Sequence, residues 1–275
     1  VKELAVVYWY NYEQEIEDPY YLSIRLAIEQ KAEEYGYRVH TVSPSNIDSL
    51  TPGAVGVIVL GRLEDDAMLD TLKEQFENVI VVDNNFARHD IDYVGSDFAL
   101  ATRNALDYLY KLGHRRIARI GGGIIADDAE GFLDQRDVVY KQFMKEHGIY
   151  NEELIHWCSV STKEAFKTTN DVLKIEPRPT AILVNNDSMA IGVYRAVAEA
   201  GLRIPEDISV LSFNDQPSAK YMMPPLTSVR IYTKFIGFAS VDLIAEKERV
   251  SREYSKNIVL PTELKIRRSC AQANE

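Results

Sequence analysis

Three apolar runs in this sequence end in short clusters of amide and carboxyl side chains. "NVIVV" is followed by Asp83-Asn84-Asn85, "AILV" by Asn185-Asn186-Asp187, and "ISVLSF" by Asn214-Asp215-Gln216. Helix caps and turns account for one polar residue at each end, and we predict Asp187 as the N-cap of the helix that ends before Gly201. The neighbouring amides need another explanation. Three clusters at equivalent positions favour a binding site.

Such side chains suit a ligand that carries several hydroxyl groups. Amides and carboxylates donate and accept hydrogen bonds in pairs, as vicinal hydroxyls require, and the apolar faces of a sugar ring pack on aromatic rings. The segment "YWYNYEQEIEDPYYLSI", residues 8–24, supplies many aromatic rings. Tyr8 or Trp9 is explained as core of a first strand. Tyr20 and Tyr21, directly after Pro19, are therefore the better candidates for a sugar site.

Arg136 is a further candidate, because it stands in the acid-rich stretch "DDAEGFLDQRD" just before a helical pattern. A guanidinium group there could hold two hydroxyls at once. The structural alternative is a surface ion pair with Asp134 or Asp137. Both interpretations remain open from the sequence.

The glycine run Gly121-Gly122-Gly123, taken with Ala126, formally fits the dinucleotide-binding pattern G-x-G-x-x-G/A. Three acidic residues follow within the same stretch and would repel a pyrophosphate: Asp127, Asp128 and Glu130. A flexible glycine turn is the simpler interpretation, and we expect no nucleotide cofactor.

Enzymatic chemistry finds little support in the rest of the chain. The five histidines show no metal-ligand spacing, and there is no G-x-S-x-G elbow and no Walker loop. The basic stretch 111–116 spans a helix end and a strand start, where cations favour the helix dipole. We therefore expect neither an enzyme nor a metal site.

These candidates must be positioned by the regular elements, which alternate between short apolar runs and longer amphipathic stretches. The strand-like runs are Leu4–Tyr10, Arg38–Val42, Gly56–Leu60, Val79–Asp83, Tyr93–Gly95, Arg116–Ile120, Ala181–Val184, Ile208–Phe213 and Ser228–Ile231. The helical patterns include Tyr20–Tyr35, Phe98–Leu112, Arg136–His147, Ser188–Ala200 and Thr233–Lys247. Several strands are apolar throughout, as in parallel sheets buried on both faces. This alternation predicts an α/β fold with parallel sheets, and a break near Val94–Asp97 divides it into two Rossmann-like subdomains with a ligand cleft between them.

Composition narrows the class of protein further. The net charge of -11 over 275 residues repels nucleic acid at long range, so a DNA-contacting part would lie outside this chain. The chain starts directly on its first strand, which suggests a fragment of a longer protein. The two cysteines match no metal or redox spacing and are expected to be reduced thiols of a cytoplasmic protein. No apolar run is long enough to cross a membrane.

Several longer phrases together resemble the LacI/GalR family of bacterial transcription repressors. They are "KLGHRRIARIGG" (111–122), "PTAILVNNDSMAIGVYRAVAEAGLRIPEDISVLSFNDQPSAKYMMPPLTSVR" (179–230) and "LPTELKIRRSC" (260–270). The resemblance implies two periplasmic-binding-protein-like subdomains, residues 1–96 with 233–257 and residues 97–231 with 260–275. It implies crossovers near Ser96, Ile231–Thr233 and Asn257–Leu260, a homodimer, and an N-terminal helix-turn-helix DNA-binding domain that is absent here. The helix Tyr20–Tyr35 is a candidate part of the dimer face.

The same resemblance assigns ligand-binding roles by position. The assigned residues are Tyr20, Tyr21 and Ile24 after the first strand, Asp83 and Ser96 at further positions of the cleft, Arg136, Asn186 followed by Asp187, and Asn214 with Asp215. Two departures from the family pattern stand out. Val139 replaces a usual glycine after Arg136, and Asn214 replaces the first acid of the usual "F-D-D" phrase.

Taken together, these features predict the effector-binding core of a non-enzymatic, sugar-responsive DNA-binding repressor, in which lobe closure changes the affinity for operator DNA. "DPYYLSIRLAIE" (18–29) is similar to galactose-operon repressors of low-GC Gram-positive bacteria, so a galactose-type sugar is the expected effector. The alternative is an extracytoplasmic sugar-binding receptor of a transporter, which shares the fold. The phrases "GHRRIA" and "IPEDISV", together with dimerisation, distinguish the two.

Overall fold

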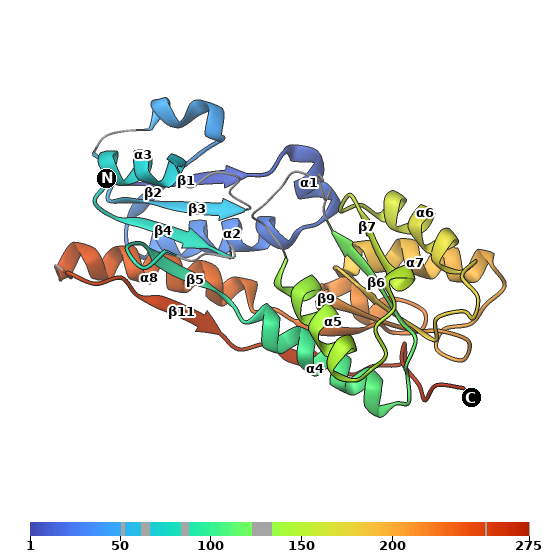
Figure 1. Cartoon of the computed structure of the whole chain (residues 1–275). Helices are drawn as coiled ribbons and strands as arrows, with labels where there is room; N and C mark the ends of the chain where they lie inside the picture. The colour runs from blue at the N-terminus through green and yellow to red at the C-terminus, as the bar shows by residue number, and fades with distance from the viewer. Residues whose placement is uncertain (51–52, 62–66, 84–87, 123–133, 251, 275) are drawn as a thin grey trace. The chain divides into compact units, whose positions relative to one another are not determined.

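The computed structural model describes the chain except residues 51–52, 62–66, 84–87, 123–133, 251 and 275. It divides into two units, each built from two stretches of chain (Figure 1). Unit 1 comprises residues 1–96 and 232–261, and unit 2 comprises residues 97–231 and 262–275. The last division falls after Pro261 rather than within the predicted crossover Asn257–Leu260, because those four residues form a strand of unit 1.

Unit 1 contains a six-stranded sheet in the order β11-β5-β4-β3-β1-β2, and every pairing described is parallel. Its strands are β1 (Lys2–Trp9), β2 (Tyr37–Val42), β3 (Gly56–Gly61), β4 (Val79–Val82), β5 (Asp92–Ser96) and β11 (Asn257–Leu260). β3 and β4 are buried at every position. Continuous apolar strands are what a parallel sheet covered on both faces requires.

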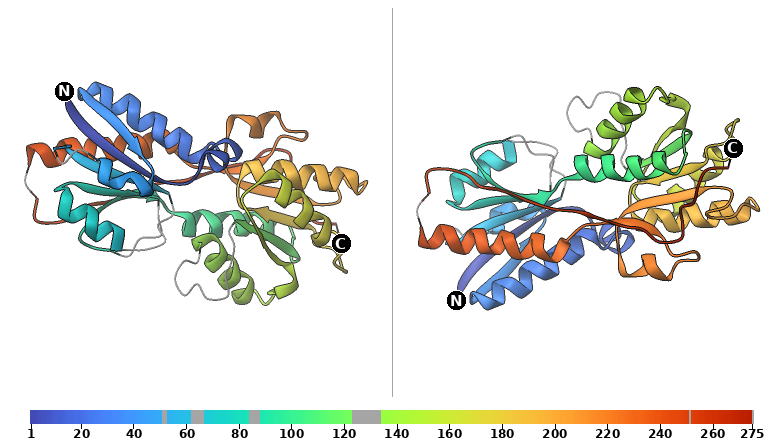
Figure 2. Two further views of the ribbon diagram at one scale, coloured as in Figure 1. Left: turned by 90° about the horizontal axis from the view of Figure 1, so that it is seen from above. Right: turned by 90° about the horizontal axis from the view of Figure 1, so that it is seen from below.

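Helices cover both faces of this sheet (Figure 2). They are α2 (Tyr20–Glu34), α3 (Ala67–Gln75) and α8 (Thr233–Arg249), with a short 3-10 helix at Pro44–Ser49, whereas α1 (Tyr12–Glu17) follows the carboxyl end of β1 and has no buried residue. α2 and α8 pack together on one face, and Leu69 and Leu72 of α3 pack with Val57 and Val81 on the other. The alternation of side chains along each strand supplies both apolar surfaces.

Unit 2 repeats the plan with a sheet in the order β12-β10-β9-β8-β6-β7. Its strands are β6 (Ile117–Gly122), β7 (Ile155–Cys158), β8 (Ala181–Val184), β9 (Ser209–Asn214), β10 (Thr227–Arg230) and β12 (Glu263–Lys265). All pairings are parallel except that β12 runs antiparallel to β10. The helices are α4 (Phe98–Lys111), α5 (Gln135–Glu146), α6 (Thr162–Val172) and α7 (Asp187–Glu199). α4 pairs with α5 on one face and α6 with α7 on the other (Figure 2).

Strand order locates the point at which each sheet can bind a ligand. In unit 1 the chain goes from β1 outward to β2 and then back to β3 on the other side of β1; in unit 2 it goes from β6 to β7 and back to β8. Ligands of open parallel sheets bind outside the carboxyl ends of the strands at such a reversal. In unit 2 that point is the end of β6 and β8, where "ILVNND" lies.

The predicted α/β class is confirmed, and each predicted strand and helix overlaps an observed one. Gly36, Gly113, Gly148 and Gly201 each follow a helix and have positive φ, the conformation that ends helices and that glycine adopts most readily. The sequence did not predict α1, α3, α6, β7, β11 or β12. β7 reads "IHWC" and is buried only at its first residue, and α6 carries five polar or charged side chains after Phe166 and Ala165 in "TKEAFKTTNDV". β7 therefore lacks the apolar run that marks the other strands, and α6 buries only Ala165, Thr169 and Val172 at helical spacing, of which one is polar.

Candidate functional site

The three polar residues that follow β8 have three different roles. The side chain of Asn186 accepts a hydrogen bond from the backbone nitrogen of Met189 at 2.8 Å and is the N-cap of α7. The prediction that Asp187 is the cap is therefore wrong, since Asp187 is the first residue of the helix. The helix begins one residue earlier than its apolar pattern suggested. Asn186 thus combines a structural bond with the ligand contact predicted for it.

Asp187 is buried and joins the ends of three neighbouring strands. Its carboxylate accepts hydrogen bonds from the hydroxyls of Ser212 on β9 and Ser228 on β10 (2.7 Å for Ser228), and from the backbone nitrogen of Gln216 at 2.6 Å. Burial raises the pKa of Asp187 to about 7, although these three donors oppose the shift. Asp187 therefore links β8, β9 and β10 at their carboxyl ends. With this pKa, its carboxyl group changes charge near neutral pH.

Asn185 holds a fully buried arginine that the sequence did not single out. Arg119, on β6, has no exposed surface. Its Nη2 donates to Oδ1 of Asn185 at 2.7 Å, and its Nε donates to Oδ1 of Asp137 at 2.8 Å. Its Nη1 donates to the backbone oxygens of Ile120 and Leu183. All three guanidinium nitrogens are therefore bonded inside the protein, and the group ties β6, β8 and the first turn of α5 together.

Arg136 lies at the start of α5 beside this cluster. Its guanidinium makes a double contact with the Asp134 carboxylate, with Nη2 and Oδ2 2.6 Å apart, and its Nη1 donates to the backbone oxygen of Asn185 at 2.8 Å. The rings of Phe98 and Phe213 lie 4.9 and 5.4 Å from its central carbon. Its side chain is 15% exposed. Arg136 does pair with Asp134, as the structural alternative supposed, but in a half-enclosed aromatic setting rather than on an open surface.

The arginine changes the acidity of its partner. Burial alone would raise the pKa of Asp134, but the charge and hydrogen bonds of Arg136 lower it to about 2. The pair is therefore ionised at neutral pH. Its oxygen and nitrogen atoms, flanked by aromatic rings, form the kind of surface on which a sugar hydroxyl and a sugar face can both be bound.

Gly121 and Gly122 lie inside β6, so the prediction of a flexible turn at these two residues is wrong. Each leaves room for a side chain of the polar cluster. A Cβ on Gly122 would stand 2.4 Å from Nδ2 of Asn185, and one on Gly121 would stand 2.6 Å from the Trp157 ring and 3.1 Å from Asp137. The glycines serve packing. Gly123 and residues 126–130 of the dinucleotide-like pattern lie outside the described residues.

The end of β9 is strained and tied down. Asn214 and Asp215 have φ angles of 103° and 52°, in the region that favours glycine. The Asp215 carboxylate, 1% exposed, is paired with Arg230 at 2.7 Å and with Arg267 at 2.5 Å. Such strain persists only where neighbouring contacts impose it, and it concentrates at binding sites. The two ion pairs hold the Asp215 side chain in place at this strand end.

Unit 1 presents its own cluster at the carboxyl ends of β1 and β4. The hydroxyl of Tyr20 donates to Oδ2 of Asp83 at 2.5 Å. Tyr21 stacks on Tyr10 with ring centres 5.2 Å apart and meets Tyr20 edge-on. Asp83 also has a positive φ, 53°, so every non-glycine residue with positive φ in the described part of the chain is one of the predicted site residues. Asn84 and Asn85 lie outside the described residues.

Two further predicted residues of unit 1, Ile24 and Ser96, take no part in the hydrogen bond and ring contacts of Tyr20, Tyr21 and Asp83. Ile24 is on the buried face of α2 with no exposed surface, because that face packs against the sheet and α8. Ser96 ends β5, and its buried hydroxyl has no hydrogen-bond partner among the described residues. A buried hydroxyl without a partner is costly, which is consistent with a site that a ligand completes.

The structure thus brings Arg136, Asn186, Asp187 and the Asn214–Asp215 pair to one edge of the unit 2 sheet, and Tyr20, Tyr21 and Asp83 to one edge of the unit 1 sheet. Sequence reasoning missed the residues that hold them: Arg119, Phe98, Arg230 and Arg267. One signal was available for Arg119, a charged residue between Ala118 and Ile120 in the interior of an apolar strand. The others depend on contacts between distant segments.

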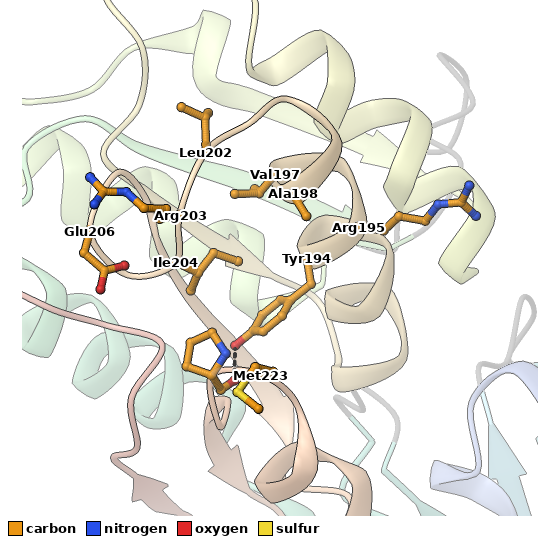
Figure 3. Close-up of a pocket in the computed structure, with 10 residues that line it drawn as sticks. Tyr194, Arg195, Val197, Ala198, Leu202, Arg203, Ile204, Glu206 and Met223 are labelled. Atoms are coloured by element: carbon orange, nitrogen blue, oxygen red, sulfur yellow. Dashed lines mark hydrogen bonds between the residues drawn. The ribbon is translucent and has the colours of Figure 1, made fainter.

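A shallow groove of about 560 Å³ lies elsewhere on unit 2 (Figure 3). It is lined by the second half of α7 and the segments around Ile204 and Met223, and the hydroxyl of Tyr194 points to the backbone oxygen of Pro224, 3.1 Å away. No predicted site residue lines it. Among the described residues no three His, Cys, Asp or Glu side chains are grouped to hold a metal ion, both cysteines are free thiols, and no helix is long and apolar enough to cross a membrane.

Comparison with known proteins places this geometry in a family. Residues 106–270 match the family described as "Periplasmic binding protein-like domain". The chain is 31% identical to the HTH-type transcriptional regulator GalR of Streptococcus thermophilus, over 97% of this chain and 81% of that protein. It shares its fold with a LacI-type transcriptional regulator of Bacillus cereus (TM-score 0.87, 24% identity, 99% of both chains) and with a ribose-bound LacI family regulator of Enterococcus faecium (TM-score 0.85, 22% identity, 99% and 100%). The chain belongs to the LacI/GalR family of transcriptional regulators, which are not enzymes, and has the periplasmic-binding-protein-like fold of their effector-binding core.

Proposed function

We propose that this chain is the sensor core of a repressor and that it binds a neutral sugar, with a galactose-type sugar as the expected effector. The observation that carries the proposal is Arg136, whose paired guanidinium packs on the neighbouring rings of Phe98 and Phe213 and donates to the backbone oxygen of Asn185. Family membership supports a regulator. The polar strand ends of both sheets, with the tyrosines of unit 1, support a ligand rich in hydroxyls.

The charges of the site favour a neutral ligand over a phosphorylated one. Arg119 and Arg136 are each paired with an aspartate of their own, Asp137 and Asp134. A phosphate would therefore have to displace an existing carboxylate, whereas hydroxyls can bond to the pairs as they stand.

Several further features follow from the family resemblance and stay proposals. The sugar is proposed to bind between the two units and to favour one arrangement of them. The chain would act as a homodimer in the cytoplasm, and a helix-turn-helix domain outside these 275 residues would contact operator DNA. Sugar binding would then change the affinity for DNA through its differential affinity for the two arrangements.

A thermal-shift screen tests the ligand class. Monosaccharides, disaccharides, their phosphates and purines are each added to the purified chain, and the melting temperature is measured. A ligand that binds only the folded state raises it in proportion to its concentration over Kd. We expect a rise with a neutral sugar, galactose-type sugars first, and none with sugar phosphates. A response to purines alone, or to no sugar, would reject the proposal.

The residue that carries the proposal has its own test. At sugar concentrations that saturate the unmodified chain, Arg136→Ala should show no sugar-dependent rise while the protein stays folded, because Asp134 is partly accessible and can be solvated. Arg195→Ala is the control, since Arg195 also pairs with a carboxylate, that of Glu199, and packs on the Phe166 ring, but on the exposed side of α7. If Arg136→Ala binds the sugar as the unmodified chain does, the assigned site is wrong.

A further inference from the structure

We propose that Arg119 is a positioning residue that sets the orientation of Arg136 for the effector, without touching the effector itself. The expected effect on sugar binding rests on the proposed function, but the contacts of Arg119 that suggest its role are independent of any ligand. Arg119 is fully buried on β6, between β7 and β8 of the unit 2 sheet, and each of its guanidinium nitrogens donates to a partner within the protein. Its side chain has no exposed surface through which it could contact a ligand.

The link between the two arginines runs through one residue, Asn185. The side-chain oxygen of Asn185 accepts from Arg119 at 2.7 Å, and its backbone oxygen accepts from Arg136 at 2.8 Å. Holding the side chain of Asn185 therefore fixes the direction of the carbonyl to which Arg136 is bonded.

A second link runs through α5. Arg119 is paired with Asp137 in the first turn of α5, and Arg136 is the residue directly before Asp137. Asp134, the N-cap of the same helix, holds Arg136 from the other side. Arg119 thus fixes both supports of Arg136, the start of α5 and the end of β8, from a single buried point.

Stability alone does not account for this arginine. Ile117, two residues earlier on β6 and therefore on the same face of the sheet as Arg119, is fully buried, so this face of the strand readily takes an apolar side chain. Taking a guanidinium and a carboxylate out of water costs several kcal/mol each, and an apolar pair of similar volume is often as stable. What the charged pair adds is directional bonding to Asn185 and Asp137. Such directional bonds are needed where the positions of side chains at the strand ends must be fixed.

The test compares Arg119→Met with Arg252→Met. Arg252 is also a buried arginine bonded to a buried aspartate, Asp92, but in unit 1 at the start of β5, away from the strand carboxyl ends. Both variants should lower the melting temperature. Only Arg119→Met should weaken binding of the sugar found in the screen, by about tenfold as measured by calorimetry, since one well-placed hydrogen bond contributes that order of affinity.

Two further measurements separate positioning from loss of stability. In an Arg136→Ala background, which retains residual binding at high sugar concentration, Arg119→Met should cause no additional loss, because its effect passes through Arg136. In the ligand-free protein, the Nε–H signal of Arg136 in a proton–nitrogen NMR spectrum should be shifted and sharp in the unmodified chain and averaged in Arg119→Met. If Arg119→Met does not fold, Arg119→Met/Asp137→Leu removes both buried charges and takes its place.

The outcomes are distinct. An unchanged Arg136 signal, an unchanged sugar affinity, or an equal loss in the Arg136→Ala background overturns the positioning role. If the unmodified chain binds no sugar at all, the proposed function fails, and the NMR signal of Arg136 still decides whether Arg119 positions it.

Discussion

The side-chain oxygen of Asn186 lies 2.8 Å from the backbone nitrogen of Met189, so the residue assigned to a ligand is also the cap of a helix. The cap uses one side-chain oxygen. Loss of binding in a simple alanine variant would therefore be ambiguous, because the helix that begins at the site would be weakened at the same time.

A pair of substitutions at Asn186 separates the two roles. Asn186→Ala should lower the free energy of unfolding by about 1 kcal/mol, the usual cost of a lost N-cap, and should also abolish sugar binding. Asn186→Ser should restore most of the stability, since serine caps well, but its shorter side chain should leave binding impaired. Urea unfolding and calorimetry measure the two quantities. Wild-type affinity in Asn186→Ser would show that Asn186 is only a cap.

The pH dependence of stability tests the buried carboxyl of Asp187. Its pKa is about 7 in the folded chain, against 3.8 for an ordinary aspartate, because burial disfavours the charged form. The folded state therefore binds more protons than the unfolded state between these values, and stability falls as pH rises through that window. The contribution is fully present below about pH 4 and is lost above pH 7; a shift of this size amounts to a few kcal/mol.

Asp187→Asn removes this dependence without removing the crosslinks. The amide oxygen can accept from the backbone nitrogen of Gln216, and the amide nitrogen can donate to the hydroxyls of Ser212 and Ser228, which also accept. We expect the variant to be more stable than the unmodified chain at pH 8 and the difference to shrink toward pH 5. Since all other titrating groups are shared, parallel stability profiles for the two proteins would contradict the shifted pKa.

The sequence allowed the sheets and their polar ends to be predicted because both signals are local. An apolar run such as "AILV" marks a buried parallel strand, and the polar residues after it mark its carboxyl end. The roles within "NND" could not be assigned, because they depend on distant partners. Asn185 bonds to a residue 66 positions away, and Asp187 to residues 25 and 41 positions away. Only the N-cap of α7 is a local interaction. Whether Asn186 or Asp187 forms it depends on the backbone conformation, which the sequence does not show.

Replacing Gly122 by alanine should fill the space that the side chain of Asn185 needs. In Gly122→Ala the new methyl group would stand 2.4 Å from Nδ2 of Asn185, so Asn185 must move and its bond to Arg119 must be distorted. Overpacking of this kind costs about 1–3 kcal/mol, and we expect sugar affinity to fall as well. Gly148→Ala is the control, because Gly148 has a positive φ of 67° and open space around it. It should lower stability through backbone strain and leave affinity unchanged. Equal affinity in both variants would show that the position of Asn185 does not matter for binding.

The hydroxyl of Tyr20 offers a test of the unit 1 half of the site. Tyr20→Phe keeps the ring and its edge-on contact with Tyr21 but removes the 2.5 Å bond to Asp83. Asp83 is held at a positive φ and is itself assigned to the ligand. Without this donor its carboxylate should lose its fixed direction. We expect a several-fold loss of sugar affinity together with a loss of stability of about 1–3 kcal/mol, the cost of removing one partner of a buried hydrogen bond.

Tyr37→Phe is the matched control for this variant. Tyr37 is a buried tyrosine of the same unit whose hydroxyl also donates to a carboxylate, that of Glu248, but it stands at the first residue of β2, at the amino end of the sheet. Removing its hydroxyl should reduce stability by a comparable amount and leave the sugar affinity at the value of the unmodified chain. If both variants lose affinity equally, the loss reports general weakening of unit 1. If neither does, Tyr20 and Asp83 form a structural bond only, and ligand recognition rests on the residues of unit 2.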